Sequence, residues 1–257
     1  MKKILVFGIA LILAVTSIIN AQPYDSESDF NVARTSDGKA VIITGYSGSK
    51  SSISIPPQIR NLPVTIIEEK AFYGKELTGV IIPNSVKTIG KWAFLGNQLT
   101  SVTIGNSVTS IGDTAFYGNK LTSVIIPDSV ISIERDAFSS NQLNSVTIGN
   151  SVTTIGYHAF AYNQLTSVTI PNSVTSIGGS AFKWNQLNSV TIPNSVTSIE
   201  WQAFTSSFLT RITISDNVSI LVSRQDCVFD RFAEFYERIG RRAGTYVYQN
   251  GSWSEEW

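Results

Sequence analysis

Few residues of this 257-residue chain could perform acid–base, nucleophilic or metal chemistry. His158 is the only histidine and Cys227 the only cysteine, which excludes a histidine-based triad, a multi-histidine zinc site and an internal disulfide. The acidic side chains are scattered, as at Glu134, Asp136 and Glu200, and they form no calcium-type acidic repeat. A site built of carboxylates alone stays open, but the sequence favours a protein that is not an enzyme and has no cofactor.

The two single residues have plain structural interpretations. His158 lies at a variable position of a repeated segment, so we expect an exposed surface residue. Cys227 precedes an aromatic run and is interpreted as a small, partly buried apolar residue. A reactive or intermolecular thiol is the alternative for Cys227.

Hydroxyl side chains recur at a spacing that suits binding rather than catalysis. They occupy alternate positions of short extended segments and are expected to point away from the core. The pairs are Ser101 and Thr103, Ser145 and Thr147, Ser167 and Thr169, and Ser189 and Thr191, with Ser123–Ile125 and Arg211–Thr213 in the same places of other segments. Such an uncharged face would bind by shape and many weak hydrogen bonds. Solvated strand residues without a partner are the alternative.

Aromatic residues form a second candidate binding surface, which we call the aromatic rim. They fall at the most variable positions of the repeat and comprise Tyr117, Tyr157, Tyr162, Trp184 and Trp201, with Tyr73 before them. Exposed aromatic rings on a rigid scaffold suit contact with proteins or glycans. Packing of these rings against neighbouring coils is the alternative.

These side chains are positioned by a repeat with a constant step. The dipeptide Ala-Phe recurs every 22 residues, and its phenylalanines are Phe72, Phe94, Phe116, Phe138, Phe160, Phe182 and Phe204. Leucine, valine and isoleucine recur with the same step, and six complete units run from Leu77 to Phe208. A fixed period of this size is the sequence signature of a solenoid.

One unit predicts a strand, a turn, a second short extended segment and a short helical or 3₁₀ piece. Burying its seven apolar side chains contributes roughly 10–20 kcal/mol, whereas ordering 22 residues costs about 20–40 kcal/mol. A unit is therefore stable only when it stacks on its neighbours. Asparagine recurs near the end of five units, at Asn97, Asn119, Asn141, Asn163 and Asn185. We expect these side chains to bond to neighbouring backbone groups.

The two ends of the chain differ from the repeat. Residues 1–21 have a basic start and an apolar run, which predicts a cleaved secretory signal peptide and leaves no membrane span afterwards. Residues 22–52 are predicted as an N-terminal cap, residues 53–221 as the solenoid, and residues 222–257 as a cap of one aromatic helix and a hairpin. The net charge is zero, which argues against a nucleic-acid partner.

The repeat L-x-x-V-x-I-P-x-S-V-x-x-I-G-x-x-A-F resembles the BspA-like class of bacterial leucine-rich repeats. Residues 53–72 are similar to the first repeat of that family, and residues 230–253 to a tail of some secreted spirochaete-type members. The resemblance implies a mostly β, α/β solenoid: a right-handed coil with a parallel sheet on one face and short helical or 3₁₀ turns opposite, capped at both ends.

The resemblance also implies export and a role in attachment. We therefore expect a secreted or cell-surface adhesin that contacts host matrix proteins, or another protein or glycan macromolecule, through the repeated face. A structural or self-associating envelope protein is the alternative from another class. Ice binding through the serine and threonine lattice is a more remote one.

Overall fold

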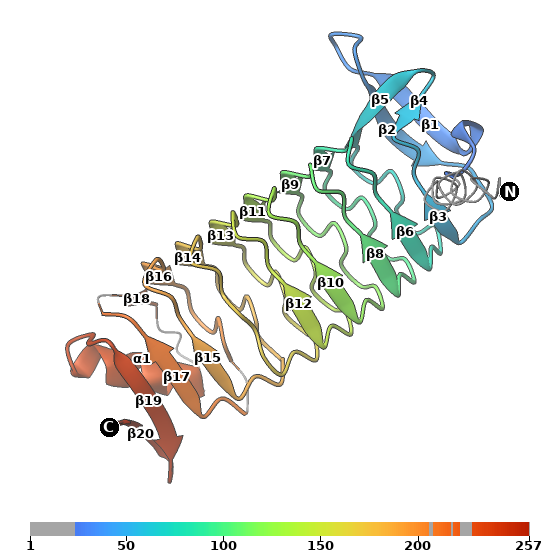
Figure 1. The fold of residues 1–257 in the computed structure, drawn as a ribbon. Helices are drawn as coiled ribbons and strands as arrows, with labels where there is room; N and C mark the ends of the chain where they lie inside the picture. The colour runs from blue at the N-terminus through green and yellow to red at the C-terminus, as the bar shows by residue number, and fades with distance from the viewer. Residues whose placement is uncertain (1–23, 206–207, 217, 222–227, 257) are drawn as a thin grey trace, which may run out of the picture.

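The computed structural model describes residues 24–205, 208–216, 218–221 and 228–256. It shows a mostly β solenoid whose coils follow one another along an almost straight axis between an N-terminal cap (blue) and a C-terminal cap (red; Figure 1). This confirms the predicted fold class. The proposed signal peptide, residues 1–21, and Cys227 lie outside the described residues.

Most coils begin with a short strand, and these strands form the first ladder of the solenoid. Neighbours pair in parallel and in register, as Ser123 does with Ser145. The strands are β3 (Ser52–Ser54), β6 (Gly79–Ile81), β8 (Ser101–Thr103), β10 (Ser123–Ile125), β12 (Ser145–Thr147), β15 (Ser189–Thr191) and β17 (Arg211–Ile214). The first ladder falls into three pieces, β3–β6–β8, β10–β12 and β15–β17.

A second parallel ladder runs without a break along the whole stack. Each of its strands within the regular coils is only two residues long. The strands are β5 (Leu62–Ile67), β7 (Thr88–Ile89), β9 (Ser110–Ile111), β11 (Ser132–Ile133), β13 (Thr154–Ile155), β14 (Ser176–Ile177), β16 (Ser198–Ile199) and β18 (Ser219–Ile220). The sequence predicted one sheet and a short extended segment, and the structure shows that this segment is the continuous ladder.

The last part of each coil consists of two consecutive tight turns. In one coil the Ala181 amide donates to the Gly178 carbonyl at 3.2 Å, and the Lys183 amide donates to the Ser180 carbonyl at 3.0 Å. The residue shared by the two turns has left-handed backbone, with φ of 56° at Ser180. A left-handed residue interrupts a helical path. This explains why the structure has paired turns where the sequence predicted a short helical or 3₁₀ piece.

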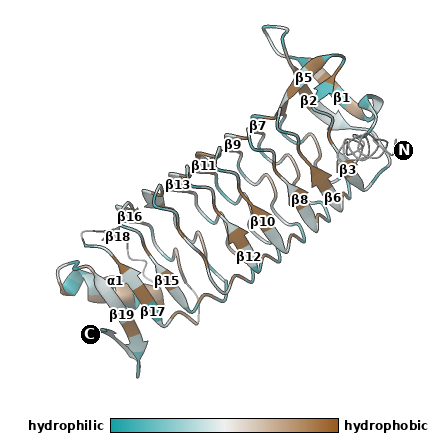
Figure 2. Cartoon of the chain, viewed as in Figure 1, coloured by the Kyte–Doolittle hydropathy of each residue, from teal (hydrophilic) through white to brown (hydrophobic). Residues whose placement is uncertain are grey.

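The phenylalanines form one buried column through the centre of the stack, as predicted. Each of the seven side chains from Phe72 to Phe204 is 0% exposed. Successive rings are nearly parallel, with centroids 4.8–5.6 Å apart and interplanar angles of 3–11°. Hydrophobic residues recur at the same places of each coil (Figure 2), so the core continues from coil to coil.

The recurring asparagines connect adjacent coils by hydrogen bonds, which confirms their predicted role. The Asn141 amide donates to the carbonyls of Phe116 at 2.9 Å and Phe138 at 3.2 Å. Its side-chain oxygen accepts from the Leu121 amide at 3.1 Å. One buried side chain thereby satisfies three backbone groups on two coils, groups that would otherwise lack partners in the interior.

The N-terminal cap covers one end of the phenylalanine column. It contains a 3₁₀ helix, η1 (Glu27–Asp29), and strand β1 (Phe30–Arg34), which pairs antiparallel with β2 (Val41–Tyr46). Strand β4 (Gln58–Ile59) pairs antiparallel with β5, and β2 pairs parallel with β5, which joins the cap to the second ladder. The rings of Phe30 and Tyr46 lie 6.4 Å and 5.9 Å from that of Phe72.

The C-terminal cap consists of helix α1 (Val228–Arg238) and the hairpin β19 (Gly244–Gln249) and β20 (Ser252–Glu255). The Phe229 ring meets the last ring of the column, Phe204, edge-on at 5.5 Å. Gly240 follows the helix with φ of 83°, as expected for a helix stop. The predicted aromatic helix and hairpin are both confirmed.

Candidate functional site

The outer face of the first ladder carries most of the predicted hydroxyl positions. Ser101, Thr103, Ser145, Thr147, Ser189 and Thr191 are all exposed and lie on β8, β12 and β15. The residues between them, such as Val190 at 3% exposure, point into the core. The alternation predicted for this face is therefore present, and we call it the strand face.

Ser167 and Thr169 were expected on a strand, but their coil has no assigned strand in the first ladder. Both side chains are exposed on the same face as the others. Their tripeptide, Ser-Val-Thr, is the same as in β8, β12 and β15, so local propensity does not explain the difference. The first ladder has only three residues per coil, and the second ladder and the asparagines already fix the coil spacing. A small increase in the distance between the backbones of adjacent coils therefore suffices to interrupt the first ladder at this coil.

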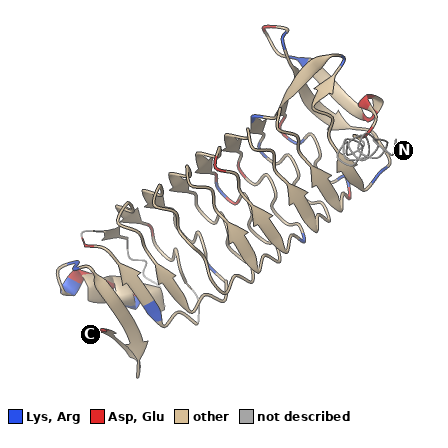
Figure 3. Cartoon of the chain, viewed as in Figure 1, with Lys and Arg blue, Asp and Glu red and all other residues tan. Residues whose placement is uncertain are grey.

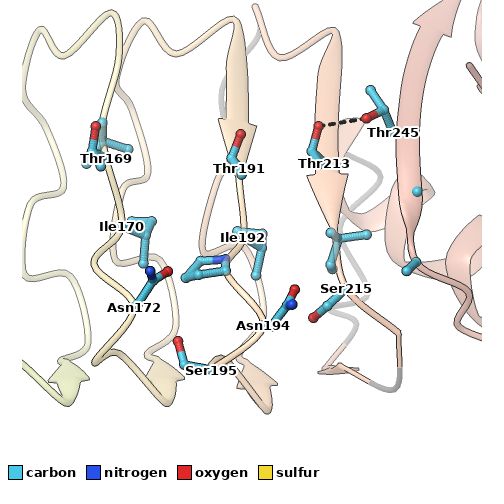
Figure 4. A pocket seen from close by; sticks show the side chains of 15 residues that line it. Thr169, Ile170, Asn172, Thr191, Ile192, Asn194, Ser195, Thr213, Ser215 and Thr245 are labelled. Atoms are coloured by element: carbon cyan, nitrogen blue, oxygen red, sulfur yellow. Dashed lines mark hydrogen bonds between the residues drawn. The ribbon is translucent and has the colours of Figure 1, made fainter.

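A groove of about 970 Å³ lies where the strand face meets the C-terminal cap. Figure 4 shows a row of threonines crossing it: Thr169, Thr191, Thr213 and Thr245. Strand β19 pairs antiparallel with β17 and continues the sheet beyond the last coil. The Thr213 and Thr245 hydroxyls are 2.9 Å apart and join the coil to the cap.

Polar and apolar groups alternate along the groove. The polar lining includes the threonines with Asn172, Asn194 and Ser215. The apolar lining includes Ile192 and Ile214, which are each 2% exposed. None of the described residues that line the groove carries a charge. Charged residues are found mainly towards the two caps (Figure 3). The groove can therefore offer hydrogen-bond donors and acceptors, but no ionic contact.

The sequence predicted the threonines of the coils but not the groove itself. The wall formed by Ala243, Gly244 and Thr245 comes from the hairpin. Alternating residues after Gly244 predicted a strand, but they did not indicate which strand it joins. Pairing with β17 is the feature that creates the groove.

The structure brings Tyr157, Tyr162 and Trp201 of the aromatic rim together and leaves Tyr117 two coils away from Tyr157. The Tyr157 and Trp201 rings have centroids 5.7 Å apart. Trp184 is 60% exposed and Tyr162 is 47% exposed. The alternative of complete packing against neighbouring coils therefore fails for these two rings.

His158 lies within this group, and the expectation of an exposed residue was wrong. Its ring is 4.0 Å from that of Tyr157 and 6.1 Å from that of Tyr162 by centroids. Its Nδ1 is 3.4 Å from a carboxylate oxygen of Asp136. Burial lowers the pKa of His158, and this effect outweighs the neighbouring carboxylate, which raises the pKa.

The described residues contain neither a metal-type cluster nor a spanning helix. No three histidine, cysteine, aspartate or glutamate side chains gather as a metal site within residues 24–205, 208–216, 218–221 and 228–256. In the part of the chain that the structure describes, no helix has the length and apolar character to cross a membrane.

Known proteins similar to this chain are bacterial leucine-rich repeat proteins. The T. pallidum leucine rich repeat protein TpLRR is 27% identical, with a TM-score of 0.60, over 84% of this chain and 95% of that one. A leucine rich cell surface protein from Faecalibacterium prausnitzii A2-165 is 26% identical, with a TM-score of 0.49, over 79% of this chain and 73% of that one. No curated protein matches the sequence.

The repeat itself matches a described family. The BspA type leucine rich repeat region matches residues 65–185 and 154–230, in 6 copies. These matches cover the same coils that carry the phenylalanine column, the asparagines and most of the strand face. The chain therefore belongs to the BspA type leucine rich repeat family.

Proposed function

We propose that this chain is an exported, non-enzymatic adhesin that binds host matrix proteins through the strand face. The observation that carries the proposal is the uncharged groove of about 970 Å³ beside the C-terminal cap. Membership of a repeat family whose fold is generally non-catalytic supports a binding or scaffold role. The TpLRR likeness supports the same scaffold.

The groove suits an extended polypeptide lying across the strands. The exposed hydroxyls of Thr169 and Thr191 can both donate and accept hydrogen bonds, as a peptide backbone requires. Thr213 and Thr245 hold each other in place, so the end of the groove is fixed before a ligand arrives. A preformed site lowers the entropic cost of binding. The hydroxyls of earlier coils extend the same surface and allow multivalent contact.

The binding experiment uses residues 22–257 on a biosensor against fibronectin, laminin and collagen. Thr191→Arg places a long charged side chain in the groove and should abolish binding. Thr197→Arg makes the same change at an exposed threonine of the same coil that lies off the strand face, and it is the matched control. Equal binding by the parent and Thr191→Arg would remove the groove from the proposal, and no binding to any of the three proteins would contradict the matrix adhesin.

Export is a separate part of the proposal, supported by the basic start and apolar run of residues 1–21. Expression of the full chain in a bacterial host should deliver a mature protein outside the cytoplasm. N-terminal sequencing should then begin at about Gln22. An intact N-terminus in the cytoplasmic fraction would contradict export.

Self-association is the second candidate, and one exposed residue favours it. Ile125 interrupts the hydroxyls of the strand face with a side chain that is 70% exposed. Exposed apolar residues of this kind occur at protein interfaces. Size-exclusion chromatography across a range of concentrations tests it. Assemblies that Ile125→Thr dissolves would favour an envelope scaffold, and a monomer throughout would favour the adhesin.

Ice binding finds less support in the geometry. A lattice-matched face requires a flat, continuous array, whereas the first ladder is divided into three pieces. Thermal hysteresis of the pure protein remains the direct measurement, and its presence would revive this function.

A further inference from the structure

We propose that the aromatic rim around Tyr162, Trp184 and Trp201 is a separate site that binds neutral glycans. These residues belong to three successive coils, on the paired turns rather than on the strand face. The site therefore does not depend on the groove. Three features of the rim indicate this site: the backbone conformation of two exposed aromatic residues, the arrangement of the rings around them, and the polar groups beside these rings.

Tyr162 and Trp184 occupy a backbone conformation that does not suit aromatic residues. Both lie at the same place of the repeat, with φ of 57° and 56°. Three earlier coils have glycine there, at Gly74, Gly96 and Gly118, with φ of 61–69°, and the next coil has Ser140, with φ of 55°. Glycine adopts this left-handed region at no steric cost, whereas a bulky residue is strained in it. The two later coils thus carry an aromatic residue where the left-handed backbone favours glycine.

Packing does not explain this replacement. A Cβ added to any of the three glycines would have nothing within 4 Å, so this place in the coil opens outward. Tyr162 and Trp184 accordingly remain 47% and 60% exposed. Strained residues that gain little burial cluster at functional sites. We infer that these two rings are held out for a ligand.

Neighbouring rings make Tyr162 part of an arc that ends at Trp201, and Trp184 lies on the coil between these two residues. The Tyr162 ring is 6.1 Å from His158, His158 is 4.0 Å from Tyr157, and Tyr157 is 5.7 Å from Trp201, all by centroids. The Tyr162 amide donates to the Lys183 carbonyl at 2.8 Å, which places Trp184 on the adjacent coil.

Gly179 leaves room for the Tyr157 and Trp201 rings to approach each other across the coil that separates them. Gly179 lies between Tyr157 and Trp201 in the stack, and a Cβ there would approach a carbon of each ring at 3.2 Å. Contacts this short would force the rings to shift. The Arg135 guanidinium lies over the Tyr157 ring at 5.2 Å. Tyr157 therefore supports the arc, and the exposed faces belong to Tyr162, Trp184 and Trp201.

The polar groups beside the arc favour a neutral sugar. The Asp136 carboxylate contacts His158, and a Glu200 carboxylate oxygen accepts from the Gly179 amide at 2.8 Å. Lys183 donates to the Gln202 side chain at 2.7 Å. With Arg135, these groups comprise two anions and two cations, so the site favours neither an acidic nor a basic ligand. The C–H face of a pyranose can stack on an aromatic ring while its hydroxyls bond to carboxylates and amides.

The experiment follows tryptophan fluorescence of residues 22–257 during titration with cellohexaose and mannohexaose. Heparin serves as the anionic probe and a proline-rich decapeptide as the protein-like one. At least one neutral hexasaccharide should bind, and Trp184→Gly and Tyr162→Gly should each weaken that binding by about tenfold or more. Tyr73→Ala, which removes an exposed tyrosine of an earlier coil, should leave the affinity unchanged.

The glycine variants also separate binding from folding. Glycine is the residue of three earlier coils at this place and adopts the left-handed backbone without strain, so both variants should keep or raise the melting temperature. Failure of both hexasaccharides to bind, equal binding by the glycine variants, or preference for heparin or the peptide would overturn the glycan site. Thr191→Arg should leave glycan binding intact, so failure here and failure of the matrix adhesin are distinguishable.

Discussion

At the scale of single residues, a few polar side chains determine how one coil joins the next. Asn97, Asn119, Asn141, Asn163 and Asn185 are buried, at 2–7% exposure, and each bonds to the backbone of its own coil and of the preceding one. Bulky polar groups in an interior are tolerated only when their hydrogen bonds are made. The buried asparagines therefore connect adjacent coils from within the core.

Asn141→Leu should destabilise the protein by about 3 kcal/mol, because it leaves buried backbone groups of two coils without partners. Asn144→Leu changes an exposed side chain of the next coil and should cost less than about 1 kcal/mol. Urea denaturation measures both. Equal midpoints for the two variants would show that the buried bonds contribute little.

His158 should make stability depend on pH. The folded protein holds the pKa of this imidazole below its ordinary value of about 6.5, mainly through burial, with Arg135 and Lys183 adding to the effect and Asp136 opposing it. The unfolded chain therefore takes up a proton near pH 6.5 that the folded chain resists. This part of the stability is complete above about pH 6.5 and declines as the pH falls towards the folded pKa.

Melting curves between about pH 5 and 8 test this effect. Asparagine tolerates the left-handed backbone of His158, where φ is 54°. His158→Asn should consequently melt with a shallower dependence on pH than the parent. Identical dependences would place the titrating group elsewhere.

At the scale of elements, the stacked rings and the two ladders form one core with a constant repeat. Each phenylalanine contacts the next ring above and below, so its removal leaves a cavity that the neighbouring coils cannot fill without losing register. The effect should be largest in the middle of the stack.

Phe138→Ala should destabilise the protein by roughly 3–5 kcal/mol, as expected for a fully buried phenylalanine. Tyr117→Ala removes a ring that is 37% exposed and should change the stability by less than about 1 kcal/mol. Differential scanning calorimetry gives both values. An unchanged melting temperature for Phe138→Ala would contradict a tightly packed column.

The sequence predicted elements whose residue types repeat, and it missed features that depend on backbone conformation or on pairing. The spacing from Phe72 to Phe204 sufficed for the column. The left-handed residue between the paired turns is never glycine in the described coils, so nothing in its residue type signalled it. The loss of the strand at Ser167–Thr169 and the pairing of β19 with β17 arise from tertiary contacts, which a single sequence does not encode locally.

At the scale of the whole molecule, the caps keep a repetitive stack from continuing into another chain. Phe30 and Tyr46 cover the first ring of the column, and Phe229 covers the last. An uncovered end would expose apolar side chains and unpaired strand edges. The caps therefore leave neither the first nor the last ring of the column open to stacking by another chain.

Phe229→Asp combined with Phe232→Asp should open the C-terminal end, because both side chains are buried, at 1% and 0% exposure. We expect association through the uncovered coil, measured as a rise in mass by light scattering after size exclusion. Arg238→Asp introduces the same residue on the exposed side of α1 and should remain like the parent. A double variant of unchanged mass would show that the helix is not needed as a cover.

The constant 22-residue step has an evolutionary consequence. Because each coil meets its neighbours through the same rings and asparagines, unequal recombination between two repeats inserts or removes one whole coil and leaves every remaining contact in phase. The protein's reach can then change in increments of about 4.8 Å, the spacing of adjacent strands. Gain or loss of a coil can thus change the distance between the aromatic rim and the N-terminal cap without changing the residues of either.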